Sequence, residues 1–141
     1  MTPRQISLVQ ASFGQLAGSA DAVAKAFYAR LFELDPSLRA MFAPDLGAQR
    51  VKLMQMLTAA VRGLDDLHTL LPAVRALGRR HAGYGVADAH YDTVGRALLD
   101  TLRSGLGAAF TPELEQAWCA VYAALSDAMR DGASVQQPIA A

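Results

Sequence analysis

The sequence has little cysteine, no long apolar run and no excess of charge of one sign, and each shortage excludes a class of protein. Its 141 residues include one cysteine, Cys119, which rules out an internal disulfide and a cysteine-rich metal cage. No apolar run reaches the roughly 18 residues that a membrane span needs, because Arg, Asp or Gln interrupts each one. The 13 basic residues balance 13 acidic ones, which argues against a nucleic acid or an anionic membrane as partner.

The start of the chain also lacks the pattern of a secreted protein. Residues 1–5 (MTPRQ) contain no basic region followed by an apolar stretch, so no signal peptide is predicted and we expect a cytoplasmic protein. Cys119 has no neighbouring His or Lys to lower the pKa of its thiol, and we expect it to be a small buried apolar residue.

What the sequence does have is apolar surface. Hydrophobic residues make up 52% and charged residues only 18%, which suits one domain with a large core, or with an apolar ligand that becomes part of the core. We expect this single domain to span residues 1–132 and a disordered C-terminal tail to occupy 133–141.

Apolar positions recur at helical spacing along almost the whole chain, and alanine is abundant. Prolines fall where runs begin: Asp35-Pro36 and Thr111-Pro112 each pair an N-cap residue with Pro at the first helical position, while Pro44 and Pro72 precede apolar-periodic runs. The predicted fold class is therefore all-α, with about seven helices packed at angles rather than a four-helix bundle. The expected helices cover 4–17, 20–34, 36–42, 46–62, 70–82, 88–106 and 112–130.

Few residues can carry chemistry. The only histidines are His68, His81 and His90, and no two share a helical face, so a zinc pair of the HxxxH type is absent. There is no nucleophile elbow of the G-x-S-x-G type, and no Gly-rich loop after a strand. Most enzyme classes with a readable signature are thereby excluded, and His68 and His90 are interpreted as solvated or capping residues.

His81 stands apart from the other two histidines because it lies on an apolar stripe. Val74, Leu77 and His81 share one face, and Gly83 and Gly85 end the helix. A histidine there can donate Nδ1–H to a carbonyl one turn back, which leaves Nε2 free to ligate a metal held by a macrocycle. The alternative is an ordinary helix-end histidine satisfied by the backbone.

Two other stretches have the composition of a ligand pocket or of a core. The run at 46–60 presents one face that begins with Gln49 and Lys52 and then becomes apolar, as in a helix lying across a flat ligand. Ahead of it, residues 27–42 hold a dense set of aromatic side chains. Each pattern is also typical of ordinary core packing.

Taken together, four segments resemble the haem-binding globins, above all bacterial single-domain globins and the haem domains of flavohaemoglobins. The segments are FYARLFELDPSLRAMF (27–42), QRVKLMQML (49–57), LGRRHAGYGV (77–86) and HYDTVGRALLDTL (90–102). Their order and spacing agree with that family, and the resemblance covers about residues 4–131. It implies a globin fold with haem b, iron protoporphyrin IX, as the cofactor.

The resemblance also implies a role for particular residues. His81 falls at the proximal position that ligates haem iron, and Tyr28, Gln49 and Leu53 fall at the positions on the distal, ligand-binding side. The expected contacts of haem itself are Met41, Phe42, Lys52, Met56, Leu77, Arg80, Val86, Tyr91 and Val94. Among these, Lys52 and Arg80 would reach the propionates, Phe42 would pack on the ring, and Tyr91 matches the proximal tyrosine of flavohaemoglobins. The glutamate that accompanies this tyrosine in flavohaemoglobins is missing, because Ala133 falls at its position, and the segment from Phe42 to Gln49 is short for the family.

The leading functional expectation is reversible binding of O₂ at a five-coordinate haem, with Tyr28 and Gln49 as hydrogen-bond donors. CO and NO are expected as further ligands, and NO dioxygenation as an activity when a separate reductase supplies electrons. A haem-based gas sensor or redox-signalling module that acts through a partner protein is the alternative, and a globin-like protein without haem is a third hypothesis. We expect a monomer or a homodimer.

Overall fold

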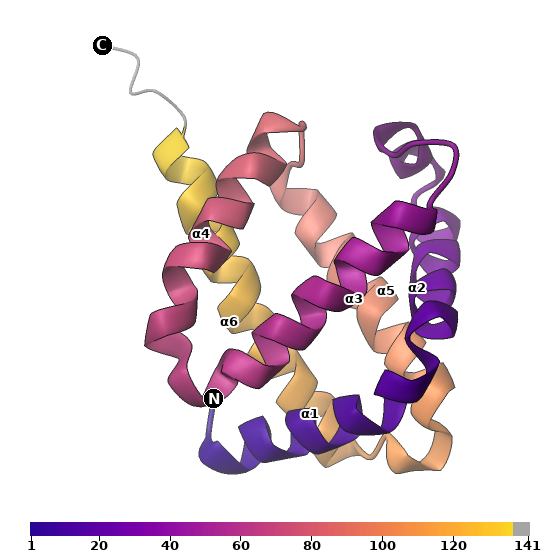
Figure 1. The fold of residues 1–141 in the computed structure, drawn as a ribbon, viewed down its shortest axis with the longest axis vertical. Helices are drawn as coiled ribbons and strands as arrows, with labels where there is room; N and C mark the ends of the chain where they lie inside the picture. Colours follow the sequence, from indigo (N-terminus) through magenta and orange to yellow (C-terminus); the bar gives the residue numbers. More distant parts are fainter. Residues whose placement is uncertain (137–141) are drawn as a thin grey trace.

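The computed structural model describes residues 1–136 and shows helices, turns and bends throughout that range, with no strand. Six α-helices form the framework (Figure 1). Their bounds are α1 Pro3–Leu16, α2 Ala20–Leu34, α3 Gly47–Arg62, α4 Leu67–Gly83, α5 Asp88–Leu106 and α6 Pro112–Gln136. Short 3₁₀ helices join them: η1 Ala17–Ser19, η2 Pro36–Met41, η3 Gly63–Asp66 and η4 Gly107–Ala109. The all-α class is confirmed, and the expected helix at 36–42 is the 3₁₀ helix η2.

Polar caps explain where several helices begin. Thr2 Oγ1 accepts a hydrogen bond from the backbone N–H of Gln5 at 3.1 Å, and the Gln5 side chain accepts one from the N–H of Thr2 at 3.0 Å. Before η2, Asp35 Oδ1 accepts from the N–H of Ser37 at 3.1 Å. Thr111 Oγ1 accepts from the N–H of Leu114 at 3.2 Å at the start of α6. The two N-caps predicted from Asp35-Pro36 and Thr111-Pro112 are thus confirmed, because each side chain satisfies a backbone donor that the first helical turn leaves free.

Two boundaries differ from the prediction by more than one residue. Helix α4 begins at Leu67 rather than at 70, so Pro72 lies inside the helix instead of in front of it. The only backbone bond lost is the one to the carbonyl of His68, an exposed residue that water can reach. Helix α5 has the predicted bounds, with Asp88 as its first residue, and His90 Nδ1 accepts a hydrogen bond from the N–H of Ala87 at 2.9 Å. Helix α6 continues through Gln136, past the expected start of the tail at 133, and the rest of that tail lies outside the described residues.

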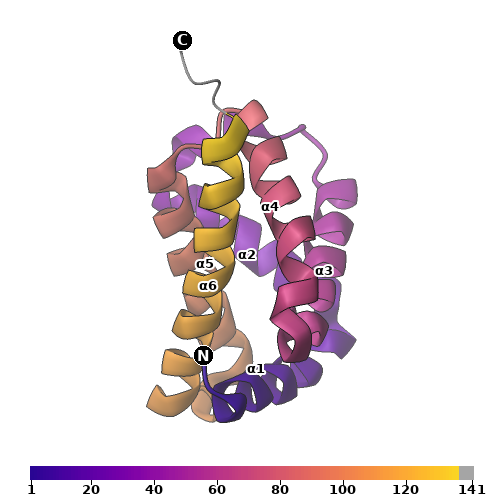
Figure 2. The same ribbon diagram turned by 90° about the vertical axis from the view of Figure 1, so that its left-hand side faces the viewer.

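The helices pack in a crossed arrangement around one core. Helix α4 packs most extensively on α6, α2 on α5 and on α3, and α1 on α6 (Figures 1 and 2). Trp118 anchors the core and donates its indole N–H to Ser12 Oγ at 2.9 Å. On the same helix Val121 is also buried, while Tyr122, Leu125 and Met129 are half-buried.

Two glycines let α4 and α6 touch at backbone level. A Cβ on Gly78 would lie 1.9 Å from the carbonyl oxygen of Met129, and one on Gly132 would lie 2.0 Å from that of Arg75. Only glycine can occupy these positions at the observed separation, because real Cβ contacts are never so short. The helix that carries His81 is therefore held directly against α6.

One buried residue was predicted wrongly. Cys119 is exposed on α6, although it is adjacent to the buried Trp118. The two side chains leave the helix in directions about 100° apart, so the neighbour of a core residue can face solvent. None of the helices among residues 1–136 has the length and apolar character that crossing a membrane requires.

Candidate functional site

Tyr28 is a buried tyrosine of α2, with only 4% of its surface exposed. Phe27, Phe32 and Phe42 surround it, with ring centroids 5.1, 6.0 and 5.5 Å from its own. Burial raises the pKa of the Tyr28 phenol, so the side chain is a neutral hydrogen-bond donor at neutral pH. A phenol in such an apolar, aromatic setting needs a polar partner.

Gln49, near the start of α3, supplies that partner. Its Nε2 donates to Tyr28 Oη at 3.2 Å, across 21 residues of sequence. Because the phenol oxygen accepts this bond, its own hydrogen remains available for another acceptor. The half-buried Gln49 amide has a second N–H as well. The structure therefore brings together the two polar residues that the sequence singled out for the distal side.

Phe42 and the short segment that follows it are held by an arginine that the sequence analysis overlooked. Arg39 donates from Nη1 to the carbonyl of Ala43 at 2.8 Å and from Nη2 to that of Pro44 at 2.7 Å. Its guanidinium also lies 5.4 Å from the centroid of the Phe32 ring. These contacts shape the loop between η2 and α3, and so set the relation between Phe42 and Gln49. Met41, which was expected to contact haem, is exposed at the end of η2.

His81 lies in the last turn of α4, half-buried, with Nδ1 2.9 Å from the carbonyl oxygen of Leu77. This is the backbone bond that the sequence predicted. A carbonyl only accepts, so Nδ1 carries the hydrogen and Nε2 has the lone pair. No hydrogen bond to Nε2 is formed within residues 1–136. Burial, and then the charge of Arg80, lower the pKa of the imidazole, which favours the neutral form that ligates metals.

The apolar residues expected to line the ring are half-buried. Leu53 and Met56 belong to α3, Leu77 to α4 and Val94 to α5, and Val86 lies in the connection between α4 and α5. Helix α3 packs mainly on α2 and helix α4 mainly on α6, and α3 and α4 do not pack extensively on each other. In Figure 1, α3 crosses the molecule obliquely, and α4 lies to one side of it, against α6. Lys52 and Arg80, the expected propionate partners, are both exposed on these two helices.

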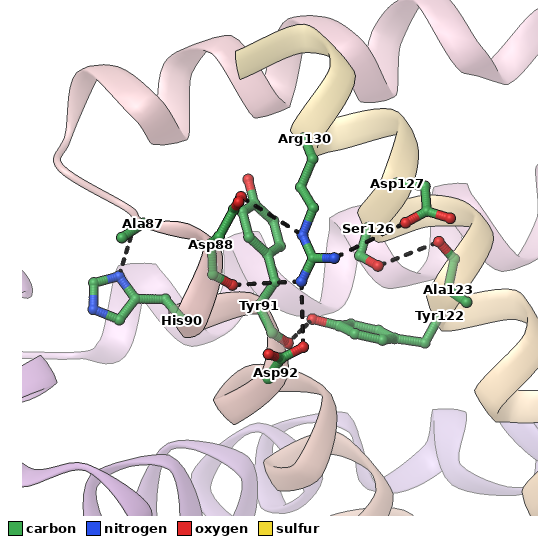
Figure 3. Close-up of polar contacts among 10 residues, drawn as sticks. All are labelled: Ala87, Asp88, His90, Tyr91, Asp92, Tyr122, Ala123, Ser126, Asp127 and Arg130. Atoms are coloured by element: carbon green, nitrogen blue, oxygen red, sulfur yellow. Dashed lines mark hydrogen bonds and ion pairs between the residues drawn. The ribbon is translucent and has the colours of Figure 1, made fainter. Parts of the chain in front are cut away.

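Tyr91, near the start of α5, and Arg130, on α6, form a second cluster of polar contacts (Figure 3). Tyr91 is 6% exposed, and its hydroxyl finds no hydrogen-bond partner within the described part of the chain. The Arg130 guanidinium lies 5.1 Å from the Tyr91 ring centroid and pairs with Asp92 at 3.3 Å and Asp88 at 3.9 Å. Tyr122 Oη donates to the carbonyl of Tyr91 at 2.5 Å. The cluster ties the start of α5 to α6, and burial raises the pKa of the Tyr91 phenol.

The sequence predicted Tyr91 as a site residue but missed Arg130. The contacts of Arg130 with Asp88 and Asp92 span 42 and 38 residues, and each partner alone is typical of a solvated helix surface. Ala133, at the position of the family's glutamate, is half-buried, and Asp131 is exposed.

Cavity size and metal-ligand clusters alone would not have found this site. A surface groove of about 520 Å³ runs along α3 and the start of α2, lined by Asp21, Arg50, Val51 and others, and it contains none of the predicted site residues. Residues 1–136 hold no group of three His, Cys, Asp or Glu side chains that could bind a bare metal ion. The arrangement suits a metal that arrives with most of its ligands, bound from one side by one imidazole.

The chain is similar to known globins over most of its length. A family model described as Globin matches residues 25–129. The chain is 39% identical to a neuroglobin of Danio rerio over 119 residues, which cover 74% of this chain and 75% of that protein. It is 31% identical to a flavohemoprotein of Vibrio cholerae over 134 residues, which cover 93% of this chain and 34% of that protein. It is 30% identical to a flavohemoprotein of Bacillus subtilis over 128 residues, which cover 89% of this chain and 32% of that protein. The chain thus spans most of the neuroglobin but only about a third of the flavohemoproteins.

Proposed function

The chain belongs to the globin family, and from that premise we propose that it holds haem b through His81 and binds O₂ reversibly beside Tyr28 and Gln49. The observation that carries this proposal is the state of His81. It is half-buried at the end of an apolar stripe, burial lowers the pKa of its imidazole, and Nδ1 bonds to the carbonyl of Leu77, which leaves Nε2 without a hydrogen bond among the described residues.

The residues present fit haem as a group. A flat apolar ring needs apolar walls, and the expected walls are Leu53, Met56, Leu77, Val86 and Val94, all of which are half-buried. A ring that covered them would remove this remaining apolar surface from water, at about 25 cal/mol per Å². Lys52 and Arg80 would stay at the surface, where they can pair with the propionates, and Phe42 would pack on the ring face. Haem would supply an iron that His81 would hold and that can take a diatomic gas.

The chain's own contribution on the ligand side is a pair of neutral donors. The hydrogen of the Tyr28 hydroxyl is free because its oxygen accepts from Gln49, and the buried rings around it keep water out. A donor in such a setting favours a ligand atom that becomes partly anionic, by roughly 1–3 kcal/mol for each hydrogen bond. O₂ develops more negative charge than CO, so the pair should favour O₂.

On the histidine side, the bond from Nδ1 to the Leu77 carbonyl fixes the orientation of the imidazole and keeps its lone pair on Nε2. Helix α4 is itself fixed by the close contact of Gly78 with α6. Tyr91 is proposed to close the lower wall of the pocket.

With NO as a second substrate, the same site could produce nitrate: NO, O₂ and one electron balance one nitrate ion. The electron for that reaction would come from a reductase, which we propose as a partner of this chain. The enzymatic role is thus conditional on a partner, whereas gas binding is not. The sensor alternative also requires a partner, and no contact or surface of the chain favours it over gas binding.

The experiment is hemin titration of the purified chain, followed by reduction and addition of CO. We expect a Soret band at one hemin per chain, and its shift with CO. His81→Ala should lose this stoichiometric binding, whereas His68→Ala, which changes an exposed histidine on the same helix, should keep it. Equal retention by both variants, or no Soret band in the unaltered chain, would contradict the proposal.

A further inference from the structure

One arginine holds the segment of chain that leads from η2 into α3, the loop at the upper right of Figure 1. Arg39 donates hydrogen bonds to consecutive backbone carbonyls. Its Nη1 lies 2.8 Å from the oxygen of Ala43, with a longer contact of 3.4 Å to that of Phe42, and its Nη2 lies 2.7 Å from that of Pro44. Arginine suits this task because its N–H groups form a rigid, planar fork. The segment is therefore wrapped around the guanidinium.

The same guanidinium also contacts the aromatic side chains around Tyr28. It lies 5.4 Å from the centroid of the Phe32 ring. The Phe32 ring is stacked on that of Tyr28 at 6.0 Å and meets Phe42 edge-on at 5.6 Å. Phe42 in turn meets Tyr28 edge-on at 5.5 Å. Arg39 thus contacts both Phe32 and Phe42, and these two rings pack on the buried phenol.

The wrapped segment also determines where α3 begins. Leu46, the residue before the helix, offers no side-chain acceptor to the first turn. The ion pair of Arg50 with Asp21 at 3.0 Å ties this part of α3 to α2. The path of residues 42–46 sets where the turn starts. Gln49 lies in this turn, so its distance from the buried phenol depends on that path.

We propose that Arg39 is a positioning residue for the ligand side of the site, where it holds Gln49 within hydrogen-bond distance of Tyr28. The inference rests on the proposed function, because this bond matters to a gas only if the two residues are the donors. The bond from Gln49 Nε2 to Tyr28 Oη is 3.2 Å long, at the upper end of the usual range for N–H···O. A small outward movement of the start of α3 is therefore enough to break it.

The test compares two substitutions of the same chemistry. Arg39→Lys keeps the charge but replaces the fork by one ammonium group, which cannot bond several carbonyls and stack on Phe32 at once. Arg39→Gln keeps a donor without the charge and should act in the same direction. Arg103→Lys is the matched control, because the Arg103 guanidinium also lies over a ring, 5.5 Å from the centroid of Phe110, and contacts none of the residues proposed for the site. Urea unfolding verifies that each variant is folded.

The main readout is the O₂ dissociation rate of the haem-loaded protein, measured in the unaltered chain and in a Gln49→Leu background. We expect Arg39→Lys to raise the rate about 3- to 10-fold, the effect of one ordinary hydrogen bond, and not beyond the rate of Gln49→Leu. In the Gln49→Leu background the same change should alter the rate by less than about twofold, because the residue through which Arg39 acts is gone. Arg103→Lys should stay within about twofold in both backgrounds, as independent sites do.

A second readout follows the Gln49 side chain directly. In ¹⁵N spectra of the CO form, its amide signals, identified by their loss in Gln49→Leu, should shift in Arg39→Lys and stay in place in Arg103→Lys. Unchanged signals or an unchanged O₂ rate in Arg39→Lys would overturn the positioning proposal. So would equal acceleration in both backgrounds, or equal acceleration of O₂ and CO, since each indicates a general loosening of the pocket. Absence of a Soret band, or an O₂ rate that neither Tyr28→Phe nor Gln49→Leu changes, would instead overturn the proposed function, and both are recorded first.

Discussion

Replacing Tyr28 by phenylalanine removes one oxygen and leaves the aromatic packing in place. The Tyr28 ring lies 5.1 Å from Phe27 and 5.5 Å from Phe42, both in edge-on geometry, and phenylalanine can keep both contacts. The hydroxyl bonds only to Gln49, which is half-buried, so water can take over the amide when the hydroxyl is gone. We therefore expect the variant to fold, with a stability loss of about 1 kcal/mol or less.

The effect on the gas ligand should be much larger. A hydrogen bond from a buried neutral donor to a partly charged acceptor contributes roughly 1–3 kcal/mol. Since about 1.4 kcal/mol corresponds to a factor of ten, its loss should raise the O₂ dissociation rate by roughly 5- to 150-fold. Gln49→Leu should raise the rate as well, but by less, because it leaves the Tyr28 hydroxyl in place.

The assay is displacement of O₂ by excess CO in a stopped-flow instrument, with the CO dissociation rate of the same variants as the control. CO carries less negative charge and should respond less to the loss of a donor. An O₂ dissociation rate within twofold of the unaltered chain, in a folded variant that retains haem, would show that Tyr28 is not the distal donor. Equal acceleration of O₂ and CO would point to changed access rather than to a lost hydrogen bond.

The remaining predictions concern the fold. Gly78→Ala should destabilise the protein by about 3 kcal/mol or more, because the new Cβ would meet the backbone of α6 at 1.9 Å. Gly14→Ala is the control: a Cβ there would have nothing within 4 Å, so the change should stabilise α1 by about 0.5–1 kcal/mol. Urea unfolding followed by circular dichroism measures both free energies, and equal effects would contradict the reasoning. Ser12→Ala should cost about 1–3 kcal/mol in the same assay, because it leaves the buried Trp118 N–H without its acceptor, and a loss below 0.5 kcal/mol would mean that another acceptor replaces it. Burial raises the pKa of the Tyr122 phenol far above its usual value. The neutral phenol therefore contributes its full share to the stability of the folded state below about pH 10, and this contribution is lost as the pH rises through the pKa of the folded state. The unfolding free energy should therefore fall above about pH 10, and Tyr122→Phe should make this fall shallower; an unchanged slope would argue against the assignment.

Most helices could be predicted from the sequence because their signals are local. Caps such as Asp35 and Thr111 act on backbone donors two or three residues away, and the structure contains both bonds. The start of α4 was misjudged because a proline usually precedes or begins a helix. Here the 3₁₀ turn Gly63–Asp66 leads directly into α4, so the helix begins before Pro72, and one backbone bond is given up near an exposed residue.

The candidate site could be predicted only where one helix contains both partners. The bond between His81 and Leu77 follows from their spacing of four residues, and the structure contains it. The contact of Gln49 with Tyr28 joins two helices, and only the resemblance to globins suggested that these residues lie together. Arg39 and Arg130 were missed because their partners are carbonyl groups and distant carboxylates, which leave no pattern in the sequence.

The high apolar content of the chain acquires a specific meaning once the core is known. Residues such as Leu31, Leu64 and Trp118 fill the interior without any ligand. Leu53 and Val94, at comparable positions of their helices, remain half-buried. A domain of this size has enough chain to bury such residues against one another, but the contacts of α3 with α2 and of α4 with α6 keep the two helices from packing together. The contact of Gly78 with α6 is made at backbone level and holds α4 against α6, while α3 is held by its packing on α2. The fold thus leaves Leu53 on α3 and Val94 on α5 partly exposed at the edge of the core, and a flat apolar cofactor that covered them would remove this surface from water.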